Sequence, residues 1–364
     1  MLESRNELSK KHRGEPAGPL RIVAIGGGTG LSALLNGLKK YTSPPRLRDS
    51  GTGFPSPVDI SAVVTVTDDG GSSGRLRREF DVLPPGDIRN CMVALSEDEA
   101  LLSRLFQYRF AAGQGLKGHS FGNLFLTALT DVTGDFAKAV RLSSEVLSIA
   151  GHIFPSTDTN VGLEATLADG RVVAGETLIS KSSARIEQIR LKPRTVKPLR
   201  ETLDAIANAD LITFGPGSLY TSVVPNLLVE GIPDAIRTSR AIKAYFVNLM
   251  WQPGETMGYT ASEHVEAINR HAGGGVLDCV VVNTRPMRKR LLEHYAKLGV
   301  GPVENDLNKL ALMGLSIVAR DLLEETRVIR HNPDMLAATG IMLAEEGRRK
   351  RLAEAIRRRR VRGK

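Results

Sequence analysis

The chain has little cysteine. Its 364 residues include two cysteines, Cys91 and Cys279, which stand far apart and form no C-x-x-C pair. This scarcity argues against a disulfide-held scaffold or a cysteine zinc site and is typical of a reducing cytosol. The chain also lacks the apolar run of roughly 18 residues that a membrane-spanning helix needs, and its polar start has no signal-peptide core. We therefore expect a cytoplasmic protein without a membrane span.

Acidic residues are scarce only at the C-terminal end. The formal net charge is +9, and residues 348–364 hold ten Lys or Arg and one acid, Glu354, which together account for all of it. The chain before residue 348 is therefore neutral overall. A basic tail of this kind can bind RNA, acidic proteins or anionic lipid, or it can be a solvated helix. Both interpretations stay open, and we expect nucleic-acid binding only through this tail.

From Leu20 onward, short apolar runs alternate with amphipathic segments of helical spacing, which predicts strands separated by helices. Such alternation favours a mostly parallel sheet with helices on both faces, an α/β fold. We predict a disordered leader at 1–19, one α/β domain at 20–335 and a basic helix or tail at 336–364. A β-rich insert at 151–196 is indicated by two alternating runs around Asp169-Gly170, a dipeptide that favours a hairpin turn. A Pro/Gly-rich loop occupies 43–57.

The stretch RIVAIGGGTGLS predicts a strand, a glycine turn and the start of a helix. A dinucleotide fingerprint, G-x-G-x-x-G, would need glycine where Leu31 stands, and one acid after the next strand. The turn still allows close approach of a ligand, because its glycines bend tightly and free N–H groups at a helix start face an anion. Thr29 and Ser32 add hydroxyl groups. The alternative is a tight turn without a ligand.

An acidic turn follows the next predicted strand, in TDDGGSSGRLRREF. Asp68 and Asp69 stand where ligands bind in open α/β sheets, at the carboxyl end of a strand. We expect one carboxylate to face a ligand and the other to cap the turn. The arginines that follow, at 75, 77 and 78, could neutralise phosphate. An Asx-capped loop before a solvated basic helix is the structural alternative.

Three further stretches carry polar groups at predicted helix starts. GLKGHSFGNLFL places Lys117, His119 and Asn123 where they suit a phosphate or a sugar hydroxyl, although a single histidine is more often structural. GPGS, at Gly215 to Ser218, repeats the strand, glycine turn and helix order. In PPGDIRN, the side chains of Asp87, Arg89 and Asn90 could reach the same cleft, although turn chemistry alone explains Pro84 to Asp87. We expect His264 and His271, which have no third ligand in view, at the surface.

Six motifs in order resemble the bacterial gluconeogenesis-factor family, a branch of the 2-phospho-L-lactate transferase superfamily. They are IGGGTGLSALLNGLK, VTVTDDGGSSGRLR, PPGDIRN, GHSFGNLFL, ADLITFGPGSLYTSVVPNLLV and QPGETMGYTASEHV. The resemblance covers about residues 20 to 335 and implies a Rossmann-like fold in the cytoplasm. It also implies a role in growth on gluconeogenic carbon sources, in cell shape and in cell-wall precursor supply, with binding of UDP-sugars such as UDP-N-acetylglucosamine. By motif, the family's uridine-sugar site would use Tyr295, stacking on uracil, and Arg330, pairing with the diphosphate.

The leading hypothesis is a regulatory protein that binds a UDP-sugar, needs no cofactor and acts through a protein partner, with a homo-oligomer left open. The predicted ligand-binding and phosphate-binding residues are Gly26, Gly27, Gly28, Thr29, Gly30, Asp68, Gly70, Gly71, Ser72, His119, Asn123, Gly215, Gly217, Ser218, Tyr295 and Arg330. The alternative is a transferase that moves a phospho-group to a hydroxyl, with magnesium at Asp68 or Asp69 and those two residues as the catalytic candidates. An NAD(P) oxidoreductase is disfavoured by Leu31 and by the missing ribose-binding acid.

Overall fold

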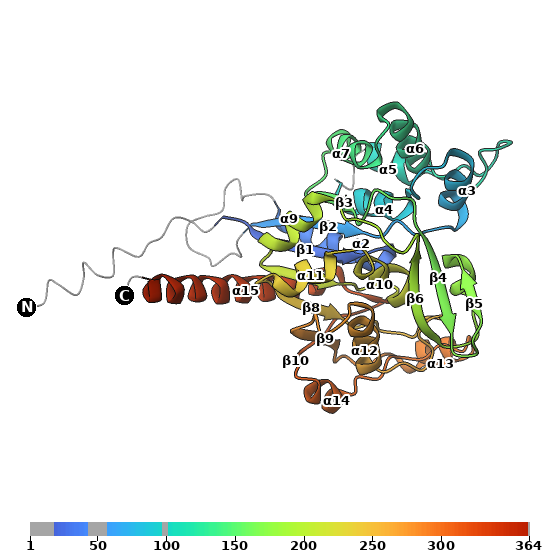
Figure 1. The fold of residues 1–364 in the computed structure, drawn as a ribbon. Coiled ribbons are helices and arrows are strands. Elements are labelled where there is room, and N and C mark those ends of the chain that lie inside the picture. Colours follow the sequence, from blue (N-terminus) through green and yellow to red (C-terminus); the bar gives the residue numbers. More distant parts are fainter. Residues whose placement is uncertain (1–17, 43–56, 97–100, 363–364) are drawn as a thin grey trace, which may run out of the picture.

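The computed structural model describes residues 18–42, 57–96 and 101–362, with side chains as far as residue 353. The leader predicted at 1–19 lies outside the described residues up to 17, and the Pro/Gly-rich loop lies outside them up to 56. Within the described parts, helices surround a central sheet, and the C-terminal helix extends away from the body (Figure 1).

The central sheet has seven strands, and every pairing in it is parallel. The strands are made from short, largely apolar runs, which suits a sheet covered on both faces. In spatial order they are β10 (Ser316–Arg320), β9 (Cys279–Asn283), β8 (Ile242–Phe246), β7 (Leu211–Phe214), β1 (Leu20–Gly26), β2 (Val58–Val64) and β3 (His152–Pro155). The predicted α/β fold with a mostly parallel sheet is therefore confirmed.

The strand order places β1 beside β7, although some 190 residues separate them in the chain. Parallel neighbours end at the same edge of a sheet, so the segments that follow β1, β2 and β7 emerge side by side. Chain order alone does not indicate this adjacency, because β2 follows β1 directly and four further strands come between β2 and β7.

Short helices connect most strands of the described chain, and three of them, those that begin at residues 121, 136 and 261, have an N-cap side chain that accepts a hydrogen bond from the first turn. The short helices are α2 (Gly28–Leu38), α3 (Gly71–Phe80), α4 (Gly86–Leu95), α5 (Leu101–Gln107), α6 (Phe121–Thr133), α7 (Phe136–Val146), α8 (Glu176–Ile179), α9 (Arg200–Asn208), α10 (Val224–Leu227), α11 (Ile232–Thr238), α12 (Ala261–His271), α13 (Lys289–Ala296) and α14 (Leu307–Leu312). At α6, the Asn123 N–H donates to the N-cap hydroxyl of Ser120. At α12, Thr260 and Glu263 form a reciprocal capping box.

The β-rich segment at 151–196 divides between two sheets. Its first strand, β3, joins the central sheet beside β2. The strands β4 (Gly162–Leu167), β5 (Val172–Ala174) and β6 (Ile186–Lys192) then form a separate antiparallel sheet in the order β5-β4-β6. Asp169-Gly170 stands in the hairpin turn between β4 and β5, with Gly170 at a φ of 82°. A second small sheet pairs β11 (Leu323–Glu325) with β12 (Ile329–His331).

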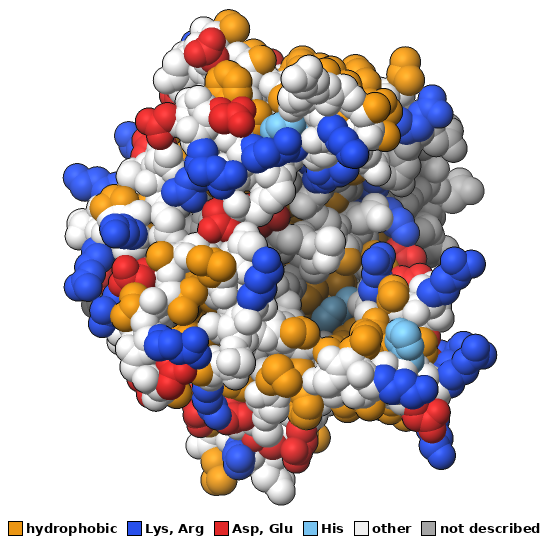
Figure 2. Space-filling view, turned by 90° about the vertical axis from the view of Figure 1, so that its right-hand side faces the viewer, with side chains coloured by type: hydrophobic (Ala, Val, Ile, Leu, Met, Phe, Trp, Pro, Cys, Tyr) orange, Lys and Arg blue, Asp and Glu red, His pale blue; other side chains and the backbone are white. Residues whose placement is uncertain are grey.

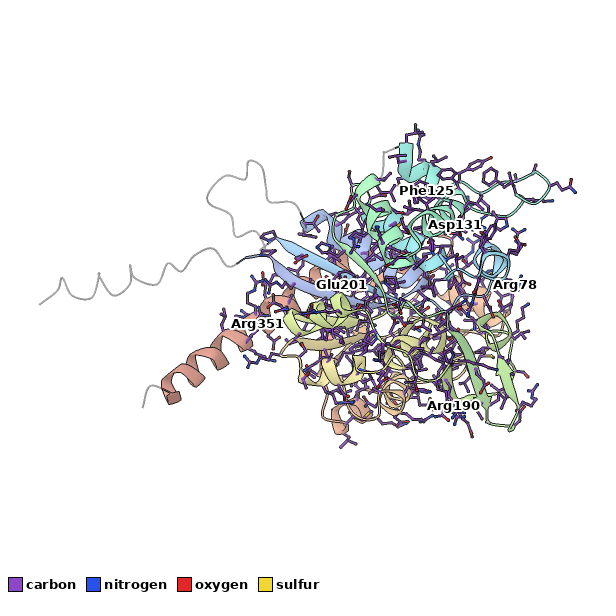
Figure 3. All side chains as sticks on the ribbon, turned by 45° about the horizontal axis from the view of Figure 1, so that its top comes forward. Arg78, Phe125, Asp131, Arg190, Glu201 and Arg351 are labelled. Carbon is purple, nitrogen blue, oxygen red and sulfur yellow. The ribbon has the colours of Figure 1, made fainter. Side chains whose placement is uncertain are left out.

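The C-terminal helix α15 (Pro333–Arg362) packs against α2, β1 and β7 at its start. Arg348 and Arg351 then pair with the carboxylate of Asp210, which follows α9 and is fully buried. Arg351 lies near the body, and the helix continues beyond it away from the protein (Figure 3). Among the described residues, no helix combines the length and the apolar character that crossing a bilayer requires.

The expected surface positions of two histidines are wrong. His264 is fully buried and its Nδ1 lies 2.8 Å from the carbonyl oxygen of Thr260. His271 is half-buried, and its Nε2 accepts a hydrogen bond from the Ile189 N–H of β6. Both belong to α12 and lie seven residues apart, which places them on one face of a helix. That face packs against the protein, because α12 is covered by β6 and by the segment around Tyr220 and Tyr259.

Candidate functional site

Two glycine turns meet at the carboxyl edge of the central sheet. The turn after β1 lies so close to the turn after β7 that a Cβ on Gly30 would stand 2.4 Å from the Pro216 carbonyl oxygen. A Cβ on Gly217 would lie 3.2 Å from the carbonyl oxygen of Gly27. Glycine is therefore required at position 30, because any side chain there would push the two turns apart. The two strand, glycine turn and helix units predicted from the sequence are thus brought together.

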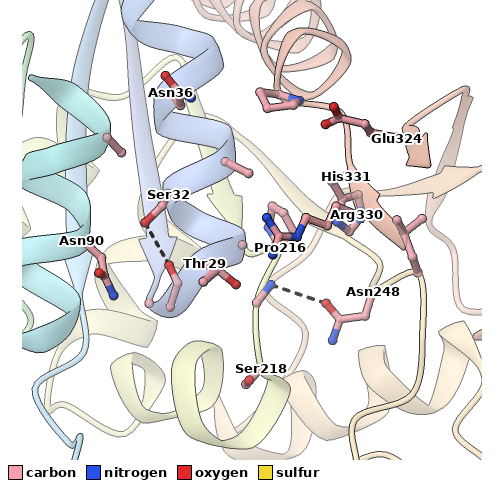
Figure 4. Close-up of a pocket in the computed structure, with 18 of the residues that line it drawn as sticks. Thr29, Ser32, Asn36, Asn90, Pro216, Ser218, Asn248, Glu324, Arg330 and His331 are labelled. Carbon is pink, nitrogen blue, oxygen red and sulfur yellow. Dashed lines mark hydrogen bonds between the residues drawn. The ribbon is translucent and has the colours of Figure 1, made fainter. Parts of the chain in front are cut away.

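A cavity of about 810 Å³ opens where the two turns meet, which is within the size range of small-molecule sites. Its lining includes seven of the predicted binding residues, shared between the two turns and β12: Gly27, Gly28, Thr29, Gly30, Gly217, Ser218 and Arg330. We call this cavity the turn pocket. Gly26 and Gly215 stand just behind its wall, and the Gly215 N–H donates to the carbonyl of Ile25. The guanidinium of Arg330 points from β12 toward the second turn (Figure 4).

The start of α2 presents backbone donors to the turn pocket, apart from the Gly28 N–H, which donates to the Asp87 carboxylate. Its N-cap residue, Gly27, has no side chain to accept a hydrogen bond from the first turn, and that turn contains no acid. The first N–H groups of a helix have no partner within the helix, so a ligand anion can accept from them. Ser32 turns its hydroxyl back to the Gly28 carbonyl, at 3.1 Å. Thr29 remains in the wall beside these donors.

Asn248 and Gln252 hold the second glycine turn in place, and the sequence analysis missed both. The Gly217 N–H donates to Asn248 Oδ1 at 3.4 Å, and Gln252 Nε2 donates to Ser218 Oγ at 2.6 Å. The two side chains are joined by a bond from Asn248 Nδ2 to Gln252 Oε1 at 3.1 Å. The available signal was position, because Asn248 closely follows the end of β8 at the same sheet edge.

Arg89 and Asn90 also line the turn pocket, from the first turns of α4. An Arg89 Nη2 donor bonds to Asn90 Oδ1 at 2.6 Å, while its Nε is buried without a partner. The PPGDIRN stretch thus serves two purposes: it starts a helix and it supplies the pocket wall. Gln107, at the end of α5, is a further lining residue that the sequence analysis did not single out.

Both carboxylates of the acidic turn have partners within the chain. Asp68 Oδ1 accepts from the Gly70 N–H at 2.8 Å, which closes an Asx turn. Asp69 Oδ1 accepts from the N–H of Thr177 at 2.9 Å and from its hydroxyl at 2.6 Å. Asp69 therefore fastens α8, which belongs to the β-rich segment, to the carboxyl edge of the central sheet. Neither aspartate is among the residues that line the turn pocket.

Four carboxyl groups gather beside this turn: Asp68, Asp69, Asp87 and Glu176. Burial, and then the charge of Asp68, raise the pKa of Asp87 to about 6. A hydrogen bond from the Gly28 N–H lowers this pKa, but by less than these two effects raise it. Burial, followed by the charges of Asp68 and Asp87, raises the pKa of Glu176 to about 9. Glu176 is therefore protonated at neutral pH and can donate a hydrogen bond.

The magnesium predicted for the transferase alternative would need several of these oxygens pointing at one position. Among the described residues, no group of three or more His, Cys, Asp or Glu side chains is arranged to hold a metal ion. The hydrogen bonds of Asp68 and Asp69 explain this, because they turn carboxylate oxygens toward Gly70 and Thr177. The residues as arranged do not fit a metal ion, and we derive no step through one.

A second group of predicted residues lies outside the turn pocket, where α3 meets α6. Ser72 Oγ lies 2.9 Å from His119 Nδ1, and Asn123 Nδ2 donates to Ser73 Oγ at 3.4 Å. Gly70 and Gly71 precede them at the start of α3. This group adjoins the acidic turn, because a Cβ on Gly86 would touch both Ser73 Oγ and Asp68 Oδ2.

Tyr295 also lies outside the turn pocket. It stands on α13, and its hydroxyl oxygen accepts from the Ile329 N–H at 3.3 Å. Ile329 in turn lines the pocket beside Arg330. The structure thus places Tyr295 behind β12, and its stacking on a base stays a prediction.

With this geometry, the chain can be compared with known proteins. The family model described as 2-phospho-L-lactate transferase CofD matches residues 22–323, which include the glycine turns and the acidic turn. The chain belongs to this CofD family. Within it, the chain is 48% identical over 312 residues to a gluconeogenesis factor of Halalkalibacterium halodurans, covering 85% of this chain and 92% of that one. It is 45% identical over 327 residues to the gluconeogenesis factor of Bacillus subtilis, covering 90% and 98%.

The resemblance to gluconeogenesis factors is therefore confirmed. A crystal structure of a Bacillus halodurans protein matches the fold with a TM-score of 0.82 at 46% identity, covering 89% of this chain and 99% of that one. A second structure from the same organism gives a TM-score of 0.83 at the same identity. The fold shared with these structures thus extends over 89% of this chain.

Proposed function

We propose that the protein binds a nucleotide sugar of the UDP-N-acetylglucosamine type in the turn pocket. The observation that carries this proposal is the convergence of the two glycine turns opposite Arg330. Backbone donors at the start of α2 and the Arg330 guanidinium suit the phosphates of a diphosphate, and the second turn forms the facing wall. A cavity of about 810 Å³ leaves room for further polar groups of such a ligand.

Side chains around these turns would orient the remainder of the ligand. Asn36, Asn90 and Gln107 line the same pocket and offer amide donors and acceptors to ribose and sugar hydroxyls. Asn248 and Gln252 would act by holding the second turn in its binding shape. We retain Tyr295 as the candidate base-stacking residue, which would need a rotation away from Ile329.

The biological role proposed here is regulatory. Relatives named gluconeogenesis factor support a part in growth on gluconeogenic carbon sources. We propose that the protein senses a nucleotide sugar in the cytoplasm and passes the signal to a protein partner of cell-wall precursor synthesis, with consequences for cell shape. Such a role requires ligand binding, and it requires neither turnover nor a cofactor.

Isothermal titration with UDP-N-acetylglucosamine tests the binding proposal. We expect saturable heat with the intact chain and affinity about tenfold weaker after Arg330→Gln, since a lost charged hydrogen bond is worth about 1.5 kcal/mol or more. Arg327→Gln is the matched control, because Arg327 is exposed in the same β11–β12 turn and does not line the pocket. Absence of binding at millimolar ligand, or equal effects of both variants, contradicts the proposal.

The second candidate function is transfer of a phospho-group from a nucleotide-activated donor to a hydroxyl. The CofD family match and the carboxyl groups of raised pKa beside the acidic turn favour it. The titrated samples, with and without magnesium, can be analysed for product by chromatography after addition of hydroxyl acceptors. A product that disappears in Asp68→Asn would establish transfer, and binding without any product would leave the regulatory role as the function.

A further inference from the structure

A group of cations lies outside the turn pocket, around the backbone turn at Lys117 and Gly118. An Arg75 Nη2 donor bonds to the Lys117 carbonyl at 2.9 Å, and an Arg109 Nη1 donor bonds to the Gly118 carbonyl at 2.6 Å. Two guanidinium groups from different elements, α3 and the segment after α5, are thus held on adjacent carbonyls. Figure 2 shows basic side chains gathered across the upper half of the face that it draws.

The histidine that follows this turn, His119, can supply a third hydrogen-bond donor beside the two arginines. His119 is 4% exposed, and its Nδ1 is engaged by Ser72 at the start of α3. Where the Ser72 hydroxyl donates to Nδ1, the proton of the neutral ring is on Nε2, which becomes a donor. Its Nε2 has no hydrogen bond within the described part of the chain.

In the part of the chain that the structure describes, no carboxylate forms an ion pair with the two arginines of this group. Burial lowers the pKa of His119, and Arg75 and Arg109 lower it further, while the exposed Glu79 acts in the opposite direction. Like charges held around a buried ring are unfavourable unless an anion offsets them. An anion bound here would therefore be stabilised by several donors.

We propose that Arg75, Arg109 and His119 form a binding site for the phosphoryl group of a second small ligand, distinct from the turn pocket. A phosphoryl dianion matches two guanidinium groups in charge, and its three terminal oxygens match three separate donors. The near-complete burial of His119 favours a small ligand over a macromolecular surface, because only a small group reaches the ring.

The site is connected to the turn pocket through Arg89. Arg89 lines the turn pocket, and the charge of Arg109 contributes to lowering its pKa after burial. The methylene carbons of Arg89 pack against Gly122, near the start of α6. A phosphorylated ligand at Arg109 would thus act on the charge of Arg89 in the wall of the turn pocket. This arrangement would let the protein respond to two metabolites together, but the second site does not depend on the identity of the first ligand.

Histidine-ring NMR with inorganic phosphate at constant ionic strength tests the proposal. We assign the His119 signal by its loss in His119→Asn, and we expect it to shift saturably in the intact chain, with its pKa raised by the bound anion. Arg75→Gln and Arg109→Gln are each expected to weaken phosphate binding about tenfold, a change of about 1.4 kcal/mol. Arg78→Gln, an exposed position on the same helix, is the control and should change the affinity less than twofold.

Three outcomes of this experiment would overturn the second site. An unshifted His119 signal would overturn the proposal, and so would a shift that sodium chloride alone reproduces. A shift lost in Arg330→Gln but kept in Arg75→Gln and Arg109→Gln would place phosphate in the turn pocket and overturn the second site. Thermal melting of each variant shows whether it is folded. Because UDP-N-acetylglucosamine is absent from this experiment, failure of the nucleotide-sugar proposal leaves its outcome unaffected.

Discussion

Asp87 connects the acidic turn with the first glycine turn. Its carboxylate lies so close to Gly27 that a Cβ there would stand 2.4 Å from Asp87 Oδ2. Burial and the charge of Asp68 raise its pKa to about 6, above the usual value of 3.8. Between these pH values the folded chain keeps a proton that the unfolded chain releases. Stability therefore falls as the pH rises from about 4 to 6, and the loss is complete above pH 6.

Replacing this carboxyl by an amide tests the effect. Asp87→Asn keeps the acceptor for the Gly28 N–H and removes the repulsion from Asp68. We expect the variant to be more stable than the parent by about 2 to 3 kcal/mol at pH 8, and by about 1 kcal/mol near pH 4.5. Urea unfolding at the two pH values measures the difference. Asp131→Asn, at an exposed site on α6, serves as control, and an Asp87→Asn effect that is the same at both pH values would count against this account.

At the scale of elements, the site depends on how closely two strand, turn and helix units approach. The contact is made by backbone on both sides, because Gly30 meets the carbonyl of Pro216. The N-terminal donors of α2 and the loop of Gly217 can then face one ligand. Backbone contacts of this kind leave no side chain that can move aside. A single methyl group must therefore shift a whole element.

The substitution Gly30→Ala follows from this contact. We expect it to displace α2 from the second turn, to lower the free energy of unfolding by about 1 to 3 kcal/mol as an overpacked site does, and to weaken UDP-N-acetylglucosamine binding more than stability alone explains. Gly275→Ala is the control, because a Cβ there meets nothing within 4 Å. Thermal melting measures the change in stability, and isothermal titration measures the change in affinity. Unchanged binding in folded Gly30→Ala would refute the role of the contact.

At the scale of the whole molecule, the start of the C-terminal basic stretch helps to hold α15 against the protein. Arg348 and Arg351 both pair with buried Asp210, and Arg348 also donates to the Gly18 and Pro19 carbonyls at the start of β1. The first turn of the tail thus ties α15 to the opposite end of the chain. The local basic charge is partly used within the fold, and the remainder of the tail continues beyond these contacts.

Arg348→Met tests this attachment. It leaves buried Asp210 with Arg351 as its cation and the Arg21 N–H as its other donor, so we expect the free energy of unfolding to fall by about 3 kcal/mol. Arg349→Met is the neighbouring control, because Arg349 is exposed and belongs to the same basic run. Chemical unfolding of the two variants measures the contrast. Equal stabilities would mean that the packing of α15 against α2, β1 and β7 is enough to hold it.

Local patterns in the sequence determined much of this protein. The alternation of apolar runs with helical spacing indicates a parallel α/β sheet, since only crossover helices can connect such strands. The glycines of 26–30 and 215–217 mark turns next to strand ends, because residues without a Cβ suit tight bends before a helix. The Asp169-Gly170 hairpin follows from its dipeptide in the same way.

Tertiary structure decided which of these turns share a site. The adjacency of β1 and β7 places Gly30 against Pro216, and no local pattern carries that information, since strand order depends on packing across the sheet. Packing also buried His264, and it turned Asp68 and Asp69 toward Gly70 and Thr177. It placed Tyr295 behind Ile329 and brought Arg75 and Arg109 to one turn. Residue types thus follow from sequence, whereas which side chains face one another depends on contacts between segments far apart in the chain.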